Sequence, residues 1–204
     1  MKKLILYVVI LFATSSLLVS CVDDKNEAKL HYNRALAQED KEAAIKGYTK
    51  AIELDPKFVN AYNNRGKAKN DLGRYESAIK DLNKAIELDP KLSIAYLNRG
   101  LSKSNLGQHE AAIKDYNKAI EFDPKLSLAY NNRALVKAKL GQYEPAIKDY
   151  TKAIELEPNN SLFYSNRAII RVKLKNLIGA CADVKKACEL GNKKECEKHQ
   201  KHCK

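Results

Sequence analysis

A period of 34 residues runs through most of this chain and constrains its fold more than any other feature. Glycine, proline and alanine each recur at that interval: Gly73, Gly107 and Gly141; Pro56, Pro90, Pro124 and Pro158; Ala78, Ala112, Ala146 and Ala180. A sustained period of this length is typical of helical repeat arrays, in which each repeat packs against the next. The sequence therefore predicts an array of stacked helical units.

Each period contains two apolar stretches with helical spacing. In residues 59–92 the first stretch ends near Gly73, and the second runs over residues 76–88, just before Pro90. Glycine suits the left-handed residue that follows a helix, and proline cannot continue a helix that has just ended. Strand signals are nearly absent from the chain. Each period is therefore expected to form two antiparallel helices.

These units closely resemble the tetratricopeptide repeat. The family's large aromatic, small residue, alanine, bulky apolar residue, alanine and proline are matched by Tyr62, Gly66, Ala78, Leu82, Ala85 and Pro90. The string AIKDYTKAIELEP at residues 146–158 is especially characteristic of the family. The resemblance covers nearly all of the chain after residue 20. It implies an all-α, right-handed superhelical solenoid of about five helix-turn-helix units with a C-terminal capping helix.

The period also predicts where the parts of the chain begin and end. Four repeats are expected at residues 59–92, 93–126, 127–160 and 161–192. Residues 21–58 hold the N-terminus and a shorter first repeat, whose inter-helix turn is three residues shorter than the others. The last repeat is atypical, because Lys175 replaces the turn glycine, and residues 193–204 form the capping helix. Atypical ends are expected of a solenoid, since its terminal units must face water.

The first 21 residues predict export and lipidation. Lys2 and Lys3 precede the apolar run LILYVVILF, as in the n-region and h-region of a secretory signal. The following LVSC at residues 18–21 resembles the bacterial lipobox, which implies a signal peptide over residues 1–20 and a lipid on Cys21. Ordinary cleavage and a retained anchor remain alternatives, although the apolar run is shorter than the ~20 residues that a membrane span needs.

The residue after the cysteine bears on location. Val22 stands where the aspartate associated with inner-membrane retention would be in many Gram-negative bacteria. The resemblance therefore implies a protein of the cell envelope, anchored by lipid to the outer membrane and facing the periplasm.

An arginine in each repeat replaces an aliphatic core residue of the family pattern: Arg65, Arg99, Arg133 and Arg167. Four residues later a second cation replaces a common tyrosine: Lys69, Lys103, Lys137 and Arg171. An aspartate follows each arginine by sixteen residues, on the partner helix: Asp81, Asp115, Asp149 and Asp183. A buried charge needs a partner, so we expect structural ion pairs; a basic ladder for acidic ligands is the alternative. The first repeat has Gly47 in the aspartate position, so Arg34 should be less constrained.

One face of each first helix is predicted to bind a partner, because residues spaced by four, three and four share a face. The candidate groove residues are Asn64, Lys67, Ile94, Asn98, Leu101, Leu128, Asn132, Leu135, Asn166 and Ile169. The resemblance implies that this face lines a concave groove, where amides would bond to a peptide backbone and aliphatic residues would hold its side chains. Alternatively, the asparagines bond within the repeat itself.

Some family members clamp the carboxylates of a peptide C-terminus with a lysine at the second position of a repeat and an arginine at the sixth. Here the second positions are Asn60, Ile94, Leu128 and Leu162. A ligand of the Hsp C-terminal type is therefore not expected.

Four cysteines lie near the C-terminus: Cys181, Cys188, Cys196 and Cys203. Gly191 and Asn192 break the helix there, and a hairpin at this point would oppose Cys188 with Cys196 and Cys181 with Cys203. The string ACELGNKKEC resembles the bridged hairpin of cysteine-rich Sel-like repeats. Of the three possible connectivities, we predict this nested one. The nearby His199 and His202 lack CxxC partners, so no metal site is predicted.

Charge and motifs restrict the function. The net charge is +12, but basic residues alternate with Asp and Glu, which does not favour nucleic-acid binding. No Ser-His-Asp arrangement, phosphate-binding glycine loop or metal cluster is apparent, so we expect no enzyme, cofactor or small-molecule substrate. We predict a membrane-anchored scaffold that binds a protein or peptide partner, in envelope assembly, secretion or cell-wall enzyme organisation. The alternative is a basic binder of envelope polyanions, with strongly salt-dependent binding.

Overall fold

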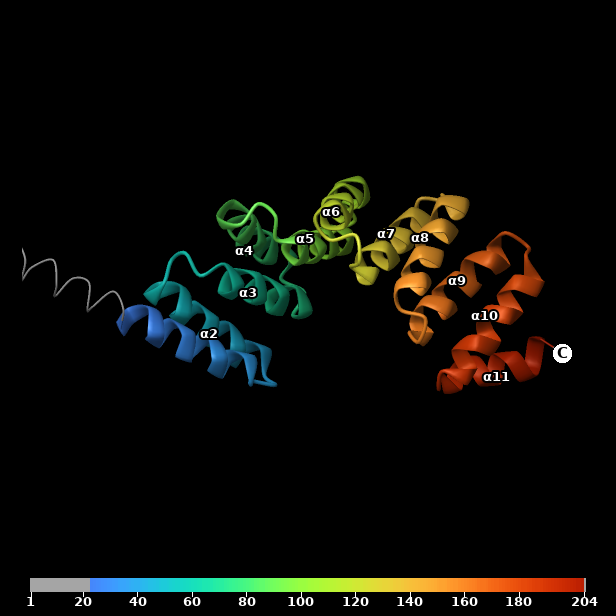
Figure 1. Ribbon diagram of the computed structural model, residues 1–204, viewed down its shortest axis with the longest axis horizontal. Coiled ribbons are helices and arrows are strands. Elements are labelled where there is room, and N and C mark those ends of the chain that lie inside the picture. The colour runs from blue at the N-terminus through green and yellow to red at the C-terminus, as the bar shows by residue number, and fades with distance from the viewer. Residues whose placement is uncertain (1–22, 204) are drawn as a thin grey trace, which may run out of the picture. The chain divides into compact units, whose positions relative to one another are not determined.

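The computed structural model describes residues 23–203, and every regular element in that range is an α-helix. Residues 23–36 are helical, and the helices that follow are α2 (Lys41–Leu54), α3 (Val59–Asp71), α4 (Tyr75–Leu88), α5 (Ser93–Asn105), α6 (His109–Phe122), α7 (Ser127–Lys139), α8 (Tyr143–Leu156), α9 (Ser161–Lys173), α10 (Leu177–Glu189) and α11 (Lys193–His202) (Figure 1). The all-α repeat fold predicted from the sequence is confirmed. The predicted signal peptide and Cys21 lie outside the described residues.

The described residues divide into two compact bodies: residues 23–89, the N-terminal body, and residues 90–203, the C-terminal body. In the N-terminal body α2 packs on α3, and α3 on α4. In the C-terminal body each helix from α5 to α11 packs on the next one. The first helices of successive pairs, α5, α7 and α9, also contact one another. They therefore form a row that presents one continuous face of the C-terminal body.

The turn inside each repeat explains the periodic glycine. Gly73, Gly107 and Gly141 have φ angles of 74 to 76°, in the left-handed region that glycine adopts without steric cost. Lys175 adopts the same geometry in the last repeat, with φ of 60°. In all four turns a backbone N–H reaches back to the residue five positions earlier, as in Asn176 to the carbonyl of Arg171 at 2.8 Å. The turn is therefore preserved even where the glycine is lost.

The core is distributed along the array instead of being gathered at one centre. One cluster in the C-terminal body joins α5, α6 and α7 around Tyr116, and another joins α7, α8 and α9 around Tyr150. Both rings are 1% exposed, and burial raises the pKa of each tyrosine above its ordinary value. Small residues let them pack, since a Cβ added at Gly100 would lie 2.7 Å from the Tyr116 ring. Each repeat therefore depends on its neighbours for burial.

Two disulfides hold α11 against α10. Cys181 is bonded to Cys203 and Cys188 to Cys196, with Cα atoms 5.5 and 4.6 Å apart. These are the nested pairs that the hairpin at Gly191 led us to expect. The sequence of α11, KKECEKHQKH, offers little apolar surface for packing. Covalent links therefore replace apolar burial as the main support of this last helix.

Candidate binding groove

The repeated arginines are bound inside the array. In all four repeats the arginine and the aspartate form a bidentate ion pair, with Nη2 to Oδ1 distances of 2.6 to 2.7 Å. The aspartates are 3 to 6% exposed. Each arginine also lies over a tyrosine of its own helix, with 5.3 to 5.8 Å between the guanidinium carbon and the ring centroid. The arrangement is that of a structural pair.

The second cation of each repeat uses the same carboxylate. Lys69, Lys103, Lys137 and Arg171 each lie 2.8 Å from the other oxygen of their aspartate. One carboxylate thus compensates both cations that replaced core residues. Arg34, whose repeat has Gly47 in place of the aspartate, is exposed and forms no ion pair with any described residue.

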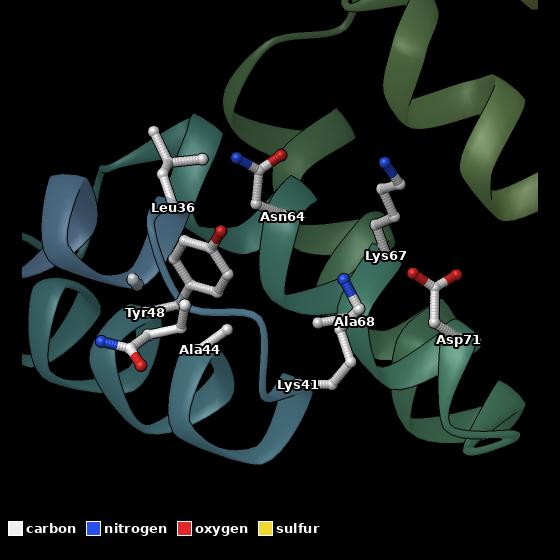
Figure 2. A pocket seen from close by; sticks show the side chains of 10 residues that line it. Leu36, Lys41, Ala44, Tyr48, Asn64, Lys67, Ala68 and Asp71 are labelled. Carbon is white, nitrogen blue, oxygen red and sulfur yellow. The ribbon is translucent and has the colours of Figure 1, made fainter.

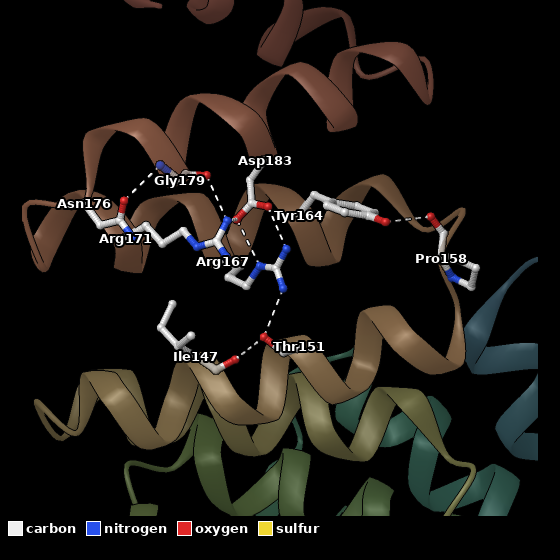
Figure 3. Close-up of polar contacts among 9 residues, drawn as sticks. All are labelled: Ile147, Thr151, Pro158, Tyr164, Arg167, Arg171, Asn176, Gly179 and Asp183. Carbon is white, nitrogen blue, oxygen red and sulfur yellow. Dashed lines mark hydrogen bonds and ion pairs between the residues drawn. The ribbon is translucent and has the colours of Figure 1, made fainter.

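A polar side chain of the preceding repeat completes the network (Figure 3). Arg167 donates from Nη1 to Thr151 Oγ1 at 2.9 Å while it holds Asp183. Arg65 and Arg133 donate in the same way to Thr49 and Asn117. Our sequence analysis missed these acceptors. Thr49, Asn83, Asn117 and Thr151 do share the 34-residue period, and that signal could have found them.

Two of the four predicted groove asparagines bond to the preceding repeat. Asn64 donates to Tyr32 Oη at 2.9 Å, and Asn166 donates to Asn131 Oδ1 at 2.9 Å. Asn132 accepts from Asn131 at 3.0 Å, and Asn98 is only 7% exposed. The alternative of bonding within the repeat thus holds for Asn132, whereas Asn64 and Asn166 bond to the preceding repeat.

The aliphatic groove residues are placed differently. Leu128, Leu135 and Ile169 are 43, 38 and 52% exposed, while Ile94 and Leu101 are half-buried. Lys67 is exposed. The first-helix face therefore offers a partner aliphatic side chains and cations more than amides.

A hollow of about 240 Å³ lies in this face of the C-terminal body, and we call it the C-terminal hollow. Tyr150 from α8 and Ile170 from α9 are its buried residues. Leu135 from α7 and Ile169 from α9 line it with exposed aliphatic groups. The remaining lining residues are Ala138, Lys139, Tyr143, Asn166 and Lys173. Three of the predicted groove residues, Leu135, Asn166 and Ile169, are thus brought together.

A second hollow, of about 190 Å³, lies in the N-terminal body, and we call it the N-terminal hollow (Figure 2). The Tyr48 ring lies at its centre, with Asn64, Lys67 and Asp71 along α3 (Figure 2). The repeat register shows that the two hollows are built alike: Tyr48, Asn64, Lys67 and Asp71 correspond to Tyr150, Asn166, Ile169 and Lys173 three periods later. The same geometry therefore carries two different sets of side chains.

Neither membrane-spanning nor metal-binding elements were found in the part of the chain that the structure describes. No helix there is both long and apolar enough to cross a bilayer. No group of three or more His, Cys, Asp or Glu residues in that part is arranged to hold a metal ion.

Comparisons with known proteins agree with the repeat architecture. Sequence models described as "Tetratricopeptide repeat" match residues 59–92 and 127–160, and residues 82–114 and 149–182; a model described as "TPR repeat" matches residues 37–70 and 104–141. Together these matches extend over residues 37–182. Two of the matched segments have the bounds of repeats predicted above.

Solved structures with a similar fold include three of interest. The crystal structure of MamA is 29% identical over 76% of this chain and 91% of that chain, with a TM-score of 0.67. The first TPR of Spaghetti (RPAP3), bound to the HSP90 peptide SRMEEVD, is 28% identical over 57% of this chain and 95% of that chain, with a TM-score of 0.55. YrrB, titled a TPR protein with an unusual peptide-binding site, is 20% identical over 87% and 90% of the two chains, with a TM-score of 0.67, and shows the fold alone.

Proposed function

Because this chain belongs to the tetratricopeptide-repeat family, we propose that it is a non-catalytic scaffold that binds a protein or peptide segment on the face of its first helices. The observation that carries the proposal is a set of exposed aliphatic residues on α7 and α9: Leu128, Leu135, Leu162 and Ile169, which are 38 to 52% exposed. Soluble proteins rarely expose such groups together unless a partner covers them.

The second helices α6 and α8 have an ordinary charged, solvent-exposed surface. They carry lysine–glutamate pairs at i and i+3, as in Lys118 with Glu121 and Lys152 with Glu155, at 2.8 and 2.9 Å. The first helices α7 and α9 expose leucine and isoleucine instead. Between α6 and α8 on one side and α7 and α9 on the other, this difference supports partner binding by the first helices; among the second helices, α10 also exposes Leu177 and Ile178, and these two residues serve as the control below.

One of the structural relatives supports a peptide or protein segment as the ligand class. The first TPR of Spaghetti (RPAP3), which is 28% identical to this chain, was solved with an HSP90 peptide bound. This chain has Asn60, Ile94, Leu128 and Leu162 at the second positions of its repeats, so it would hold its partner by contacts other than the lysine–arginine clamp.

We further propose that the scaffold is tethered by a lipid on Cys21, at the outer membrane and facing the periplasm, where it organises envelope assembly, secretion or cell-wall enzymes. The support is the LVSC string after a charged and apolar leader, with Val22 following. Mass spectrometry of the membrane fraction should find a mature N-terminus at Cys21 that carries acyl chains. An unmodified Cys21 would contradict the tether.

The alternative, a basic binder of envelope polyanions, receives less support. Its strongest candidates were the repeated arginines, and each of them is held by an aspartate within its own repeat. Binding that disappears at moderate salt and needs no aliphatic groove residue would favour it instead.

Crosslinking in intact cells tests the scaffold function. Replacing Leu135 and Ile169 together by alanine should abolish capture of a specific partner, because both side chains belong to the exposed face. The matched control replaces Leu177 and Ile178 of α10, which are 63 and 90% exposed but lie outside the first helices. Capture that survives the first pair of changes, or is lost equally with the control pair, would contradict the proposal.

A further inference from the structure

We infer that the segment bound at the C-terminal hollow is acidic, with one bulky apolar side chain between α7 and α9 and carboxylates beside Lys139 and Lys173. This inference rests on the proposed function and specifies the chemistry of its ligand. It is carried by the shape of the hollow, by its unpaired lysines and by the contrast with the N-terminal hollow.

The hollow has the size and lining of a binding pocket for one apolar side chain. Its volume is about 240 Å³, whereas a cavity of about 150 Å³ is enough to hold a benzene molecule. Tyr150 and Ile170 are 1 and 7% exposed and close it on the protein side, while Leu135 and Ile169 remain open to solvent. An aliphatic or aromatic side chain would cover these two residues and remove their apolar surface from water.

The two lysines that line the hollow have no carboxylate partner among the described residues. Lys139 and Lys173 are exposed, and neither forms an ion pair with any described residue. Two lysines of the second helices differ from them in this respect, because Lys118 and Lys152 each pair with a glutamate three residues later. The cations at the hollow are therefore available to a ligand.

These lysines are not required by their helices. A cation in the last turn does favour the negative end of the helix dipole. However, the corresponding last residues of α3 and α5 are Asp71 and Asn105, and both helices run to those residues without a cation there. The lysines of α7 and α9 therefore distinguish this hollow from its equivalents along the array.

No acidic side chain belongs to the described residues that line the hollow. Residues 159–182 contain neither Asp nor Glu. Asp149 directly precedes Tyr150 in sequence, but its carboxylate is ion-paired with Arg133 and Lys137. The described lining therefore carries two lysines and no carboxylate, and an acidic segment complements it.

The N-terminal hollow would not select the same segment. There Lys67 replaces Ile169 and Asp71 replaces Lys173, so the apolar wall is interrupted and an acid stands where the ligand's carboxylate would lie. Of the two hollows, only the C-terminal hollow is therefore expected to select an acidic segment.

Panning a displayed library of random peptides on the purified full chain tests the inference. The enriched peptides should combine several Asp or Glu residues with a Leu, Ile, Met or Phe. An enriched peptide should then bind the variant with Lys139→Glu and Lys173→Glu about tenfold or more weakly in fluorescence polarisation, with a smaller difference at high salt. The control carries Lys114→Glu and Lys148→Glu, the same charge change at exposed sites on α6 and α8, and should bind within about twofold of the unchanged chain.

The outcomes separate this inference from the proposed function. Enrichment of basic or neutral peptides, equal loss in both charge variants, or no enrichment over the Lys139→Glu, Lys173→Glu variant would overturn the acidic ligand. If neutral peptides bind and still require Leu135 and Ile169, the scaffold function stands and only the acidic preference is wrong. If the alanine variant of these two residues changes neither the panning nor the crosslinking in cells, the proposed function itself is wrong.

Discussion

The two hollows of this protein share a construction and differ in chemistry. Each places a buried tyrosine of a second helix, Tyr48 or Tyr150, behind residues of the following first helix. The positions that face solvent differ, with Lys67 and Asp71 in one and Ile169 and Lys173 in the other. The repeat therefore determines where a hollow forms, and the exposed positions determine what it can hold.

The framework behind each tyrosine differs as well. Asp149 precedes Tyr150 and ties α8 to α7 through Arg133 and Lys137. Gly47 precedes Tyr48, and a Cβ built there would lie 2.7 Å from the Cβ of Ala35. The C-terminal hollow is therefore supported by a charge network, and the N-terminal hollow by close contact of two helices.

Removing the charge network should have the largest effect. Asp149→Ala leaves two cations without a carboxylate and should lower the free energy of unfolding by about 3 kcal/mol. We take the lower end of the usual range because the Arg133 and Lys137 side chains are 16 and 19% exposed and retain some contact with water. Urea unfolding followed by circular dichroism measures the change.

The control for this prediction is Arg34→Ala in the first repeat. Arg34 is exposed and forms no ion pair with a described residue, so the expected change is within about 0.5 kcal/mol. Equal losses in the two variants would show that the networks of the two regions do not differ as the structure indicates.

Opening one disulfide should have the next largest effect, confined to the C-terminal body. Replacing Cys188 and Cys196 by serine removes a loop closure over a separation of 8 residues, which should cost about 2.5 kcal/mol. Backbone amides of α10 and α11 should then exchange their hydrogens faster, because the polar α11 has little other support. Amides of α3 should be unchanged, and an equal acceleration there would contradict a local effect.

Introducing the missing aspartate into the first repeat should destabilise the protein. Gly47→Asp supplies Arg34 with a carboxylate, but its Cβ would overlap with Ala35, so we expect a loss of about 2 kcal/mol. Lys46→Asp, at an exposed neighbouring position, is the matched control and should change the stability by less than about 0.5 kcal/mol. A more stable Gly47→Asp variant, as measured by urea unfolding, would show that the two helices can separate to accept the bridge.

The fold could be predicted from the sequence because the same local signals recur in successive repeats. The glycine period predicts the left-handed turns at Gly73, Gly107 and Gly141, and α3, α5, α7 and α9 begin where the predicted repeats begin. The sixteen-residue spacing of arginine and aspartate lies within one repeat, so its geometry follows from the helix pair. The Lys175 turn could not be predicted, since a non-glycine residue there is strained.

The candidate site was less predictable because its contacts join different repeats. Asn64 is oriented by Tyr32 and Asn166 by Asn131, and neither partner belongs to the same helix pair. A single-repeat pattern therefore identifies the face but not which of its side chains remain available. The sequence analysis did not predict the hollows, because each is lined by residues of two first helices and of the second helix between them. For the N-terminal hollow, the first repeat is in addition three residues shorter than the others.

Exchanging the exposed residues of the two hollows should have the smallest effect on stability. The same exchange tests whether these exposed positions alone determine which peptide each hollow binds. Ile169→Lys with Lys173→Asp gives the C-terminal hollow the residues of its counterpart. The acidic peptide should bind about tenfold more weakly, while the free energy of unfolding changes by less than about 0.5 kcal/mol because both positions are exposed. Polarisation and urea unfolding measure the two effects on the same preparation.

The reverse exchange, Lys67→Ile with Asp71→Lys, tests whether the shared construction is sufficient for binding. It places an apolar wall and a cation beside Tyr48, where the framework already provides a hollow of about 190 Å³. Calorimetric titration with the acidic peptide should then show one additional site per chain. If the stoichiometry does not change, the closer approach of the helices at Gly47 has altered the shape of the N-terminal hollow, and exposed residues alone do not determine what each hollow holds.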